Sequence, residues 1–240
     1  MAFGAVSAGV GDGASPAEGC DVARRAALGR FENFGRDGHP CRLGIMGGTF
    51  DPIHNGHLAI ARHAMAQLRL AGVLFVVAGD PWMKHGRAIT AAEDRFAMVR
   101  AAVAGEARFE ASRMEIDRLG ETYTADTLRA LHDFLPNSVE LYFLVGADAL
   151  AQLPAWHDAP RLGSLARFAA VSREGAPPLG SEALAKAAGA IGASEIELVS
   201  MPGMDVSSTD LREKARRGLS VRDQVPADVA DYIEMHGLYR

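Results

Sequence analysis

Two histidines stand three residues apart in the run G-G-T-F-D-P-I-H-N-G-H at positions 47–57, directly after a short apolar segment. The paired glycines allow a ligand to approach the backbone closely, because no Cβ atom stands in the way. A helix that begins within this run adds unpaired N–H groups and a partial positive charge. Together with the N–H donors of His54 and His57, these groups predict a binding site for phosphate.

The same two histidines offer an alternative, a zinc site of the kind that zinc hydrolases use. Metal-binding histidine pairs on a helix usually stand at i and i+4, whereas His54 and His57 stand at i and i+3. No third ligand is evident nearby in the sequence, and either histidine alone could equally be a helix cap or a core residue. Phosphate is therefore the favoured ligand, and we expect no metal ligand from the protein itself.

A second group of donors lies at Ser207-Ser208-Thr209, just before a helix predicted over residues 209–217. Hydroxyls and free backbone N–H groups gather at such a helix start, and Arg212 follows one turn later. The guanidinium fork of arginine binds phosphate well. A run of serine and threonine before a helix is ordinarily only an N-cap, so this group gains its functional meaning from the first one.

From residue 41 onward, apolar strands alternate with amphipathic helices. Strands are predicted over 43–46, 73–77, 108–112, 114–117, 139–145, 168–171 and 195–199. Helices are predicted over 56–70, from 90–93 to about 104, and over 124–134, 159–165, 181–190, 209–217 and 227–236. The run T-A-A-E at 90–93 is typical of a capping box. Such alternation predicts an α/β fold with a doubly wound parallel sheet, in which ligands bind beyond the carboxyl ends of the strands.

Residues 1–40 have a different composition, with eight of the 26 glycines and no sustained helical or strand period. Such a segment buries too little apolar surface to offset its ordering entropy. We therefore expect a disordered extension over 1–40, whose deletion leaves activity intact. Residues 41–240 are expected to form a single domain whose part from about 207 to 240 is helical.

Charge, cysteine content and hydropathy narrow the classes of partner. The formal net charge of −5 gives no support to nucleic-acid binding. No apolar run approaches the ~20 residues that span a membrane, so no membrane association is expected. The chain has two cysteines, outside any C-x-x-C pair, which suits a reducing cytoplasm. The sequence leaves open whether the protein is a monomer or a homo-oligomer.

The run at 47–57 resembles the signature of the nucleotidylyltransferase superfamily, whose core is H-x-G-H, here at 54–57. V-S-S-T-D-L-R at 206–212 resembles the second motif of that superfamily. Three further runs narrow the resemblance to the bacterial nicotinate-nucleotide adenylyltransferases: T-Y-T-A-D-T-L at 122–128, L-V-G-A-D-A-L at 144–150 and G-L-Y-R at 237–240. The resemblance covers about residues 42–240 and implies a Rossmann-like nucleotidylyltransferase fold.

The resemblance implies transfer of the adenylyl group of ATP to nicotinate mononucleotide, with Mg²⁺ bound through the ATP phosphates. It assigns catalysis to His54, His57, Lys84 and Arg212. Nicotinate mononucleotide would be bound by Tyr123, Thr124, Trp156 and His157, with the indole stacked on the pyridine ring. ATP would be bound by Gly47, Gly48, Thr49, Phe50, His54, His57, Gly146, Asp148, Arg173, Ser208, Thr209 and Arg212.

The chain departs from the family pattern in two places. Its lysine loop reads P-W-M-K at 81–84, where P-P-H-K is more common, and Glu174 follows Arg173 where proline is more usual. The alternatives are another H-x-G-H nucleotidylyltransferase, with nicotinamide mononucleotide or phosphopantetheine as the acceptor, or a nucleotide-binding protein without turnover. Taken singly, Lys84 could be a solvated surface residue, Asp148 a helix cap and Trp156 a core aromatic.

Overall fold

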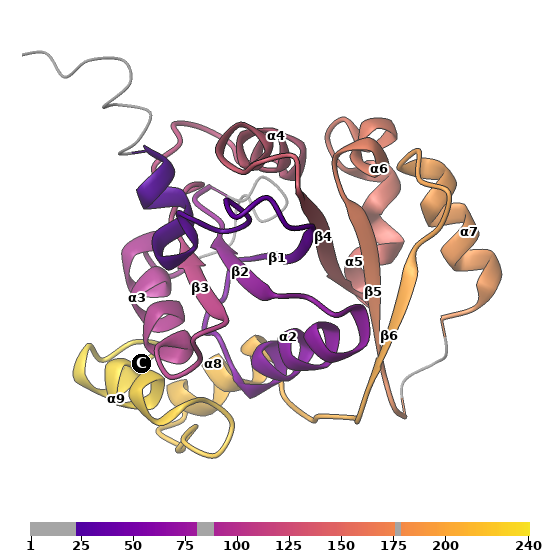
Figure 1. The fold of residues 1–240 in the computed structure, drawn as a ribbon. Helices are drawn as coiled ribbons and strands as arrows, with labels where there is room; N and C mark the ends of the chain where they lie inside the picture. The colour runs from indigo at the N-terminus through magenta and orange to yellow at the C-terminus, as the bar shows by residue number, and fades with distance from the viewer. Residues whose placement is uncertain (1–22, 81–88, 176–178) are drawn as a thin grey trace, which may run out of the picture.

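In the computed structural model, which describes residues 23–80, 89–175 and 179–240, six strands form one parallel sheet in the order β3-β2-β1-β4-β5-β6 (Figure 1). This order places β1 and β4 side by side at the point where the winding of the chain reverses. The predicted α/β fold class is confirmed. The strands are β1 (Cys41–Gly48), β2 (Gly72–Val77), β3 (Phe109–Ser112), β4 (Val139–Gly146), β5 (Arg167–Arg173) and β6 (Glu197–Met201).

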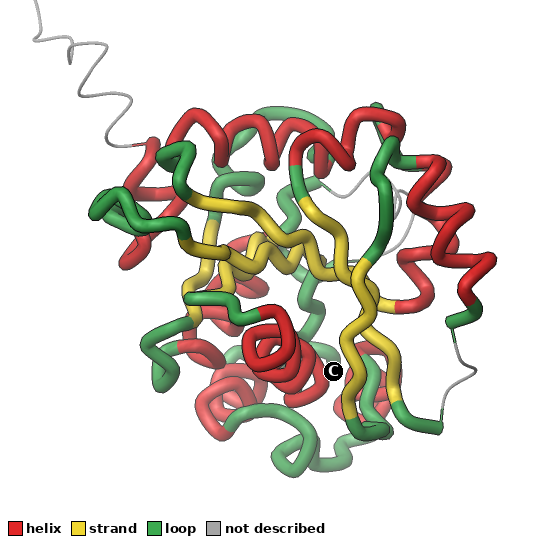
Figure 2. Tube along the Cα trace, turned by 45° about the vertical axis from the view of Figure 1, so that its right-hand side comes forward, coloured by secondary structure: helices red, strands yellow, loops and turns green. Residues whose placement is uncertain are grey.

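Helices cover both faces of the sheet (Figure 2). Apolar side chains of α2 (Asn55–Leu68), α3 (Ala92–Val103), α8 (Ser208–Arg216) and α9 (Ala227–Met235) belong to the core on one face. Those of α4 (Thr124–Phe134), α5 (Ala147–Gln152), α6 (Leu162–Leu165) and α7 (Ser181–Ala190) belong to the core on the other. The connections also contain the short 3₁₀ helices η1 (Gly29–Phe31), η3 (Leu153–Ala155) and η4 (Ala159–Arg161).

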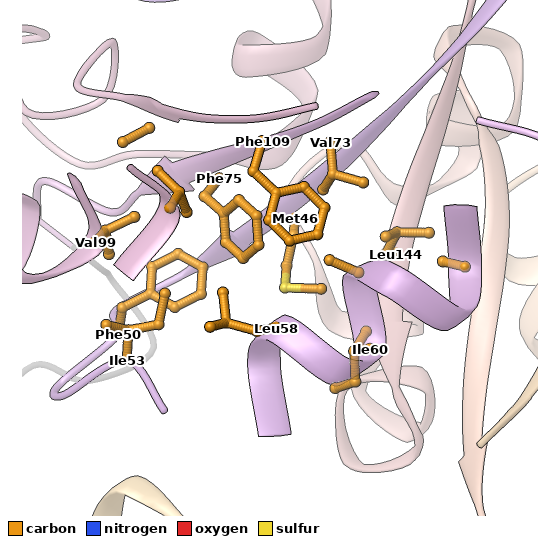
Figure 3. Packing of buried hydrophobic residues seen from close by; sticks show 14 of the residues in the cluster. Met46, Phe50, Ile53, Leu58, Ile60, Val73, Phe75, Val99, Phe109 and Leu144 are labelled. Atoms are coloured by element: carbon orange, nitrogen blue, oxygen red, sulfur yellow. The ribbon is translucent and has the colours of Figure 1, made fainter. Parts of the chain in front are cut away.

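Burial on both faces explains why the central strands read as continuous apolar runs rather than as alternating ones. All six residues of β2 are buried. Around its Phe75, the side chains of Met46, Phe50, Leu58 and Phe109 converge from β1, the turn after it, α2 and β3 (Figure 3). The turn that contains the two histidines is therefore built directly onto the core.

The expected disorder of residues 1–40 does not hold for residues 23–40. Residues 23–28 are helical and continue into η1, and Ala27, Leu28 and Phe31 are buried. The ring of Phe31 fits over Gly72, where a Cβ atom would lie 2.8 Å from it. The prediction used the composition of residues 1–40 as a whole and so overlooked these few apolar residues, which pack against the domain. Residues 1–22 lie outside the described part of the chain.

Two local predictions also differ from the structure. Residues 114–117 form a turn and not the predicted strand. The predicted capping box at residues 90–93 is not formed, because α3 begins at Ala92 after an N-cap at Ala91. Thr90 instead makes hydrogen bonds to Asp51 and Arg95. None of the helices formed by residues 23–80, 89–175 and 179–240 is long and apolar enough to cross a membrane.

Candidate active site

The two histidines lie in the turn that connects β1 to α2. His54 is the N-cap of α2, and its ring stacks on that of His57 with 3.8 Å between the centroids. The backbone N–H of His54 donates to Nδ1 of His57 over 3.3 Å. Because Nδ1 accepts this hydrogen bond, the proton of the neutral His57 ring is carried by Nε2. His57 thus presents an N–H that can donate to a phosphate oxygen.

The glycine of H-x-G-H has a steric role. A Cβ atom on Gly56 would lie 2.9 Å from Nδ1 of His54 and 3.0 Å from Val206, the first residue of the second motif. Only glycine therefore leaves room for the His54 ring to lie over the first turn of α2 beneath Val206. Gly48 similarly accommodates the ring of Phe50, which would lie 3.0 Å from a Cβ there.

His54 carries no positive charge near neutral pH. Its ring is 4% exposed. Burial, followed by the positive charge of Arg173, lowers the pKa of His54 from 6.5 to about 4. Its Nδ1 makes no hydrogen bond within the described residues. A neutral imidazole still offers one N–H donor, so the predicted role as a donor to phosphate is chemically available to it.

The second motif is hydrogen-bonded directly to the histidine turn. The hydroxyl of Ser208 donates to the carbonyl of Pro52 over 2.9 Å, and Nη1 of Arg212 donates to the carbonyl of Asp51 over 2.7 Å. Ser207 is the N-cap, since its Oγ accepts from the backbone N–H of Asp210. The two runs of sequence singled out for phosphate binding therefore meet at one edge of the sheet.

Asp51 is the centre of a buried network that the sequence analysis did not identify. Its carboxylate accepts from the phenol of Tyr239 over 2.7 Å and from the backbone N–H of Thr90 over 3.3 Å. Only 5% of Asp51 is exposed. In the sequence, Tyr239 stood out only as part of the run G-L-Y-R, and Asp51 only as part of the run at 47–57. Nothing in the sequence indicated that the two residues are bonded to each other.

Arg95 of α3 is also buried beside this turn. Its guanidinium donates to the carbonyls of Thr49 (2.9 Å), Ala78 (2.8 Å) and Thr90 (2.8 Å). The Arg95 side chain thus connects three segments: the turn after β1, the residues after β2 and the residues just before α3. In the sequence, this arginine resembles any solvated arginine of an amphipathic helix, so no signal pointed to it.

The predicted acceptor residues lie beyond β4. The ring of Tyr123 stacks on that of His157 with centroids 4.2 Å apart, and Thr124 is the first residue of α4. Trp156 packs edge-on against Phe143 of β4, with centroids 5.8 Å apart. Indole Nε1 of Trp156 is buried and has no hydrogen-bond partner in the described part of the chain.

Phe143 links this region to the first motif. Its ring lies 3.4 Å from the position of a Cβ on Gly47. Beneath Tyr123, the buried Glu115 accepts a 2.6 Å hydrogen bond from the hydroxyl of Thr127 on α4. Burial raises the pKa of Glu115. Thr127 also donates its backbone N–H to the carbonyl of Tyr123. Sequence reasoning missed this buried pair of Glu115 and Thr127, which supports the start of α4.

The remaining predicted residues follow the ends of β4, β5 and β2. Gly146 is the N-cap of α5, and Asp148 is exposed in the first turn of that helix. Arg173 ends β5 and lines a pocket of about 490 Å³. Lys84 lies outside the described residues. Within those residues, no group of three or more His, Cys, Asp or Glu side chains is placed to hold a metal ion.

Residues 45–214 match the family described as cytidylyltransferase-like. A protein of Saccharopolyspora erythraea named "probable nicotinate-nucleotide adenylyltransferase" is 47% identical over 199 residues, which cover 83% of this chain and 90% of that protein. One of Roseiflexus sp. with the same name is 48% identical over 198 residues, covering 82% and 98%.

Among solved structures, the fold is similar to that of Plasmodium falciparum nicotinic acid mononucleotide adenylyltransferase complexed with NaAD. The TM-score is 0.67 at 19% identity, over 83% of this chain and 97% of that one. The same enzyme complexed with APC gives a TM-score of 0.66 at 18% identity, with the same coverage. At this level of identity, the likeness supports the fold alone.

Proposed function

The chain belongs to the cytidylyltransferase-like family and, within it, to the nicotinate-nucleotide adenylyltransferases, and on this premise we propose which of its residues carry out the reaction. The enzyme transfers the adenylyl group of ATP to nicotinate mononucleotide, giving nicotinate adenine dinucleotide and pyrophosphate, a step of NAD biosynthesis.

The reaction needs positioning and charge stabilisation rather than a protein nucleophile. The 5′-phosphate oxygen of nicotinate mononucleotide attacks the α-phosphorus of ATP in line, and pyrophosphate leaves from the opposite side. We assign His57 to the reacting phosphate, because its ring is oriented by the backbone N–H of His54 and by stacking on the His54 ring at the start of α2. His54 is assigned beside it as a neutral donor, in keeping with its lowered pKa.

The β- and γ-phosphates are assigned to the start of α8. Ser208, Thr209 and Arg212 supply hydroxyls, backbone N–H groups and a permanent positive charge there. Gly47, Gly48 and Thr49 offer close backbone approach from the end of β1. Phe50 can contribute only its backbone, since its side chain lies in the core. A role for Lys84 rests on the family resemblance.

The nucleoside is assigned to the ends of β4 and β5. The exposed carboxylate of Asp148, next to Gly146, is suited to accept hydrogen bonds from ribose hydroxyls. Arg173 adds positive charge near His54, as its effect on the pKa of that histidine indicates. The acceptor nucleotide is assigned to Tyr123, Thr124, Trp156 and His157.

Nucleotidyltransferases generally use Mg²⁺ together with the nucleotide phosphates. The donor set of this site suits an ion that arrives bound to ATP, because the residues at the two motifs are hydrogen-bond donors rather than a carboxylate cluster. The carboxylate of Asp51 is already engaged by Tyr239 and Thr90. When bound, Mg²⁺ neutralises phosphate charge and keeps mostly water and phosphate ligands.

A single observation carries this assignment: Ser208 and Arg212 are hydrogen-bonded to Pro52 and Asp51, next to His54. Helix α8 and the histidine turn thus form one continuous surface of donors, at the carboxyl end of the parallel sheet where such folds bind ligands.

The acceptor assignment is tested by substrate choice. We expect kcat/KM for nicotinate mononucleotide to exceed that for nicotinamide mononucleotide by roughly 10²-fold or more, because the amide would leave buried donors unpaired. The ATP-dependent release of pyrophosphate measures both values. Trp156→Leu should lower kcat/KM for the acid while KM for ATP stays the same. Equal values for acid and amide would contradict the assignment of the acceptor residues.

A further inference from the structure

We infer that Tyr239 is a positioning residue for adenylyl transfer, which holds Arg212 in place through Asp51. The inference rests on the proposed role of Arg212 at the ATP phosphates and extends the site to the C-terminal end of the fold. It is carried by two hydrogen bonds to the same residue: the phenol of Tyr239 to Oδ1 of Asp51 (2.7 Å) and Nη1 of Arg212 to the carbonyl of Asp51 (2.7 Å).

The end of α9 directs Tyr239 towards the histidine turn. Gly237 has a φ of +60°, the left-handed conformation that glycine adopts at a helix end. The backbone N–H of Leu238 donates to Ile233 and that of Gly237 to Glu234, the hydrogen-bond pattern of a Schellman motif. Tyr239 itself has a φ of +64°. The chain reverses sharply, and the side chain of Tyr239 reaches the interior beside Asp51.

The phenol is a hydrogen-bond donor at neutral pH. Burial, followed by the negative charge of Asp51, raises the pKa of Tyr239 far above its usual 10. Thr90 donates its backbone N–H to the other carboxylate oxygen of Asp51 over 3.3 Å. The Asp51 carboxylate is therefore held from two directions in a region that is nearly closed to water.

Fixing Asp51 also fixes the carbonyl that Arg212 uses. The guanidinium has a second contact within α8, since Nη2 donates to the hydroxyl of Thr209 over 3.3 Å. Without the Asp51 carbonyl in its place, the long arginine side chain would regain rotamers that point away from the ATP phosphates. Losses of positioning of this kind cost rate even when they arise away from the reacting atoms.

Tyr232, on α9 itself, provides the control. Its phenol donates to Oδ1 of Asp94 on α3 over 2.9 Å, a bond of the same type and similar length. Both tyrosines bind α9 to its surroundings through an aspartate. Only the aspartate bound by Tyr239 belongs to the histidine turn. A positioning role therefore predicts a change in the ATP kinetics for the Tyr239 variant alone.

The experiment compares Tyr239→Phe with Tyr232→Phe in the full chain, by steady-state kinetics with both substrates and by thermal unfolding. We expect Tyr239→Phe to lower kcat/KM for ATP by roughly 10-fold or more, with KM for nicotinate mononucleotide within about twofold of the wild type. Tyr232→Phe should leave both values within about twofold. Tyr239→Phe should lower Tm more than Tyr232→Phe, because Asp51 is buried whereas Asp94 is only half-buried.

A double-mutant cycle tests the route through Arg212. On an Arg212→Lys background, Tyr239→Phe should change kcat/KM for ATP by less than about twofold, because the interaction it supports is already lost. Full additivity, or an unchanged kcat/KM for ATP in Tyr239→Phe, would overturn the inference. If Arg212→Lys itself leaves the ATP kinetics unchanged, the proposed role of Arg212 fails instead, and the two failures are distinguishable.

Discussion

The two histidines of the turn differ in what they can contribute to the reaction. Nδ1 of His57 accepts a hydrogen bond from the backbone N–H of His54. His54 is buried and neutral at pH 7. In the proposed assignment, positive charge at the nucleotide comes from Arg212 of α8, from Arg173 at the end of β5 and, by the family resemblance, from Lys84. His54 supplies a directed donor rather than charge.

His57→Ala should lower kcat by roughly 10²–10³-fold, as loss of one donor to a developing negative charge does elsewhere. His63→Ala, on the same helix but beyond the turn, should stay within about twofold. Release of pyrophosphate from ATP measures both. An unchanged kcat in His57→Ala would remove this histidine from the reacting centre.

The lowered pKa of His54 predicts acid sensitivity of the fold. An unfolded chain binds a proton at this ring below about pH 6.5, whereas the folded chain does so only near 4. Its contribution to stability is therefore complete above pH 6.5 and is lost as the pH falls towards 4. Between pH 7 and 5, the free energy of unfolding of the wild type should fall by about 2 kcal/mol more than that of His54→Gln. Urea unfolding at both pH values measures this difference, and equal losses would contradict it.

Among the helices and strands, the predicted elements with strong periodicity agree closely with the structure. The helix expected over 209–217 is observed at Ser208–Arg216, and the one expected over 227–236 at Ala227–Met235. The parallel order of the sheet follows from the alternation of strand and helix. This much was predictable because apolar spacing directly encodes which face of an element is buried.

Long-range polar contacts were beyond prediction from the sequence. Arg95 lies in a helix whose pattern leaves it among other charged residues, yet it is 2% exposed and bonded to three separate segments. Thr90 was assigned to a capping box, but its backbone N–H is bound to Asp51, distant in sequence. The contacts of Arg95 and Thr90 depend on which loops meet in space, and the sequence does not show this. Arginine in a helix and threonine before a helix are also common in local motifs, so their residue types gave no warning.

Arg95→Met should lower the free energy of unfolding by roughly 3 kcal/mol, because several buried carbonyls lose their hydrogen-bond donor and the Asp51 carboxylate loses a nearby positive charge. Arg100→Met is the control on the same helix, since Arg100 is exposed and only lies over the ring of Phe96. That variant should change stability by less than about 0.5 kcal/mol. Chemical denaturation of both variants measures the difference, and similar losses would show that Arg95 does not secure the turn.

Across the molecule as a whole, the N-terminal segment and the active site lie at opposite ends of the sheet. Phe31 covers Gly72 at the start of β2, and Arg30 pairs with Glu110 near the start of β3. The histidine turn, by contrast, follows the carboxyl end of β1. The segment 23–40 should therefore contribute to stability and leave the chemistry untouched.

Phe31→Ala tests this separation. Loss of its buried ring should cost about 3 kcal/mol of stability, while kcat at 25 °C stays within about twofold. Leu119→Ala, at a side chain that is 98% exposed, should leave both quantities unchanged. Deletion of residues 1–40 should likewise lower Tm and preserve kcat of the folded enzyme. A large fall in kcat in a variant that remains folded would show that residues 23–40 affect the active site.

The contact between Tyr239 and Asp51 has a consequence for synthesis on the ribosome. The two residues are separated by 188 positions in the chain. At ~5–20 residues per second, Asp51 emerges from translation about 10–40 s before its partner is made. The nascent chain can form the strands and the histidine turn during that interval. The Asp51 carboxylate lacks the hydrogen bond from the phenol until Tyr239 has been synthesised. A product that stops short of Tyr239 would keep most of the sheet and lack the bond that completes the turn.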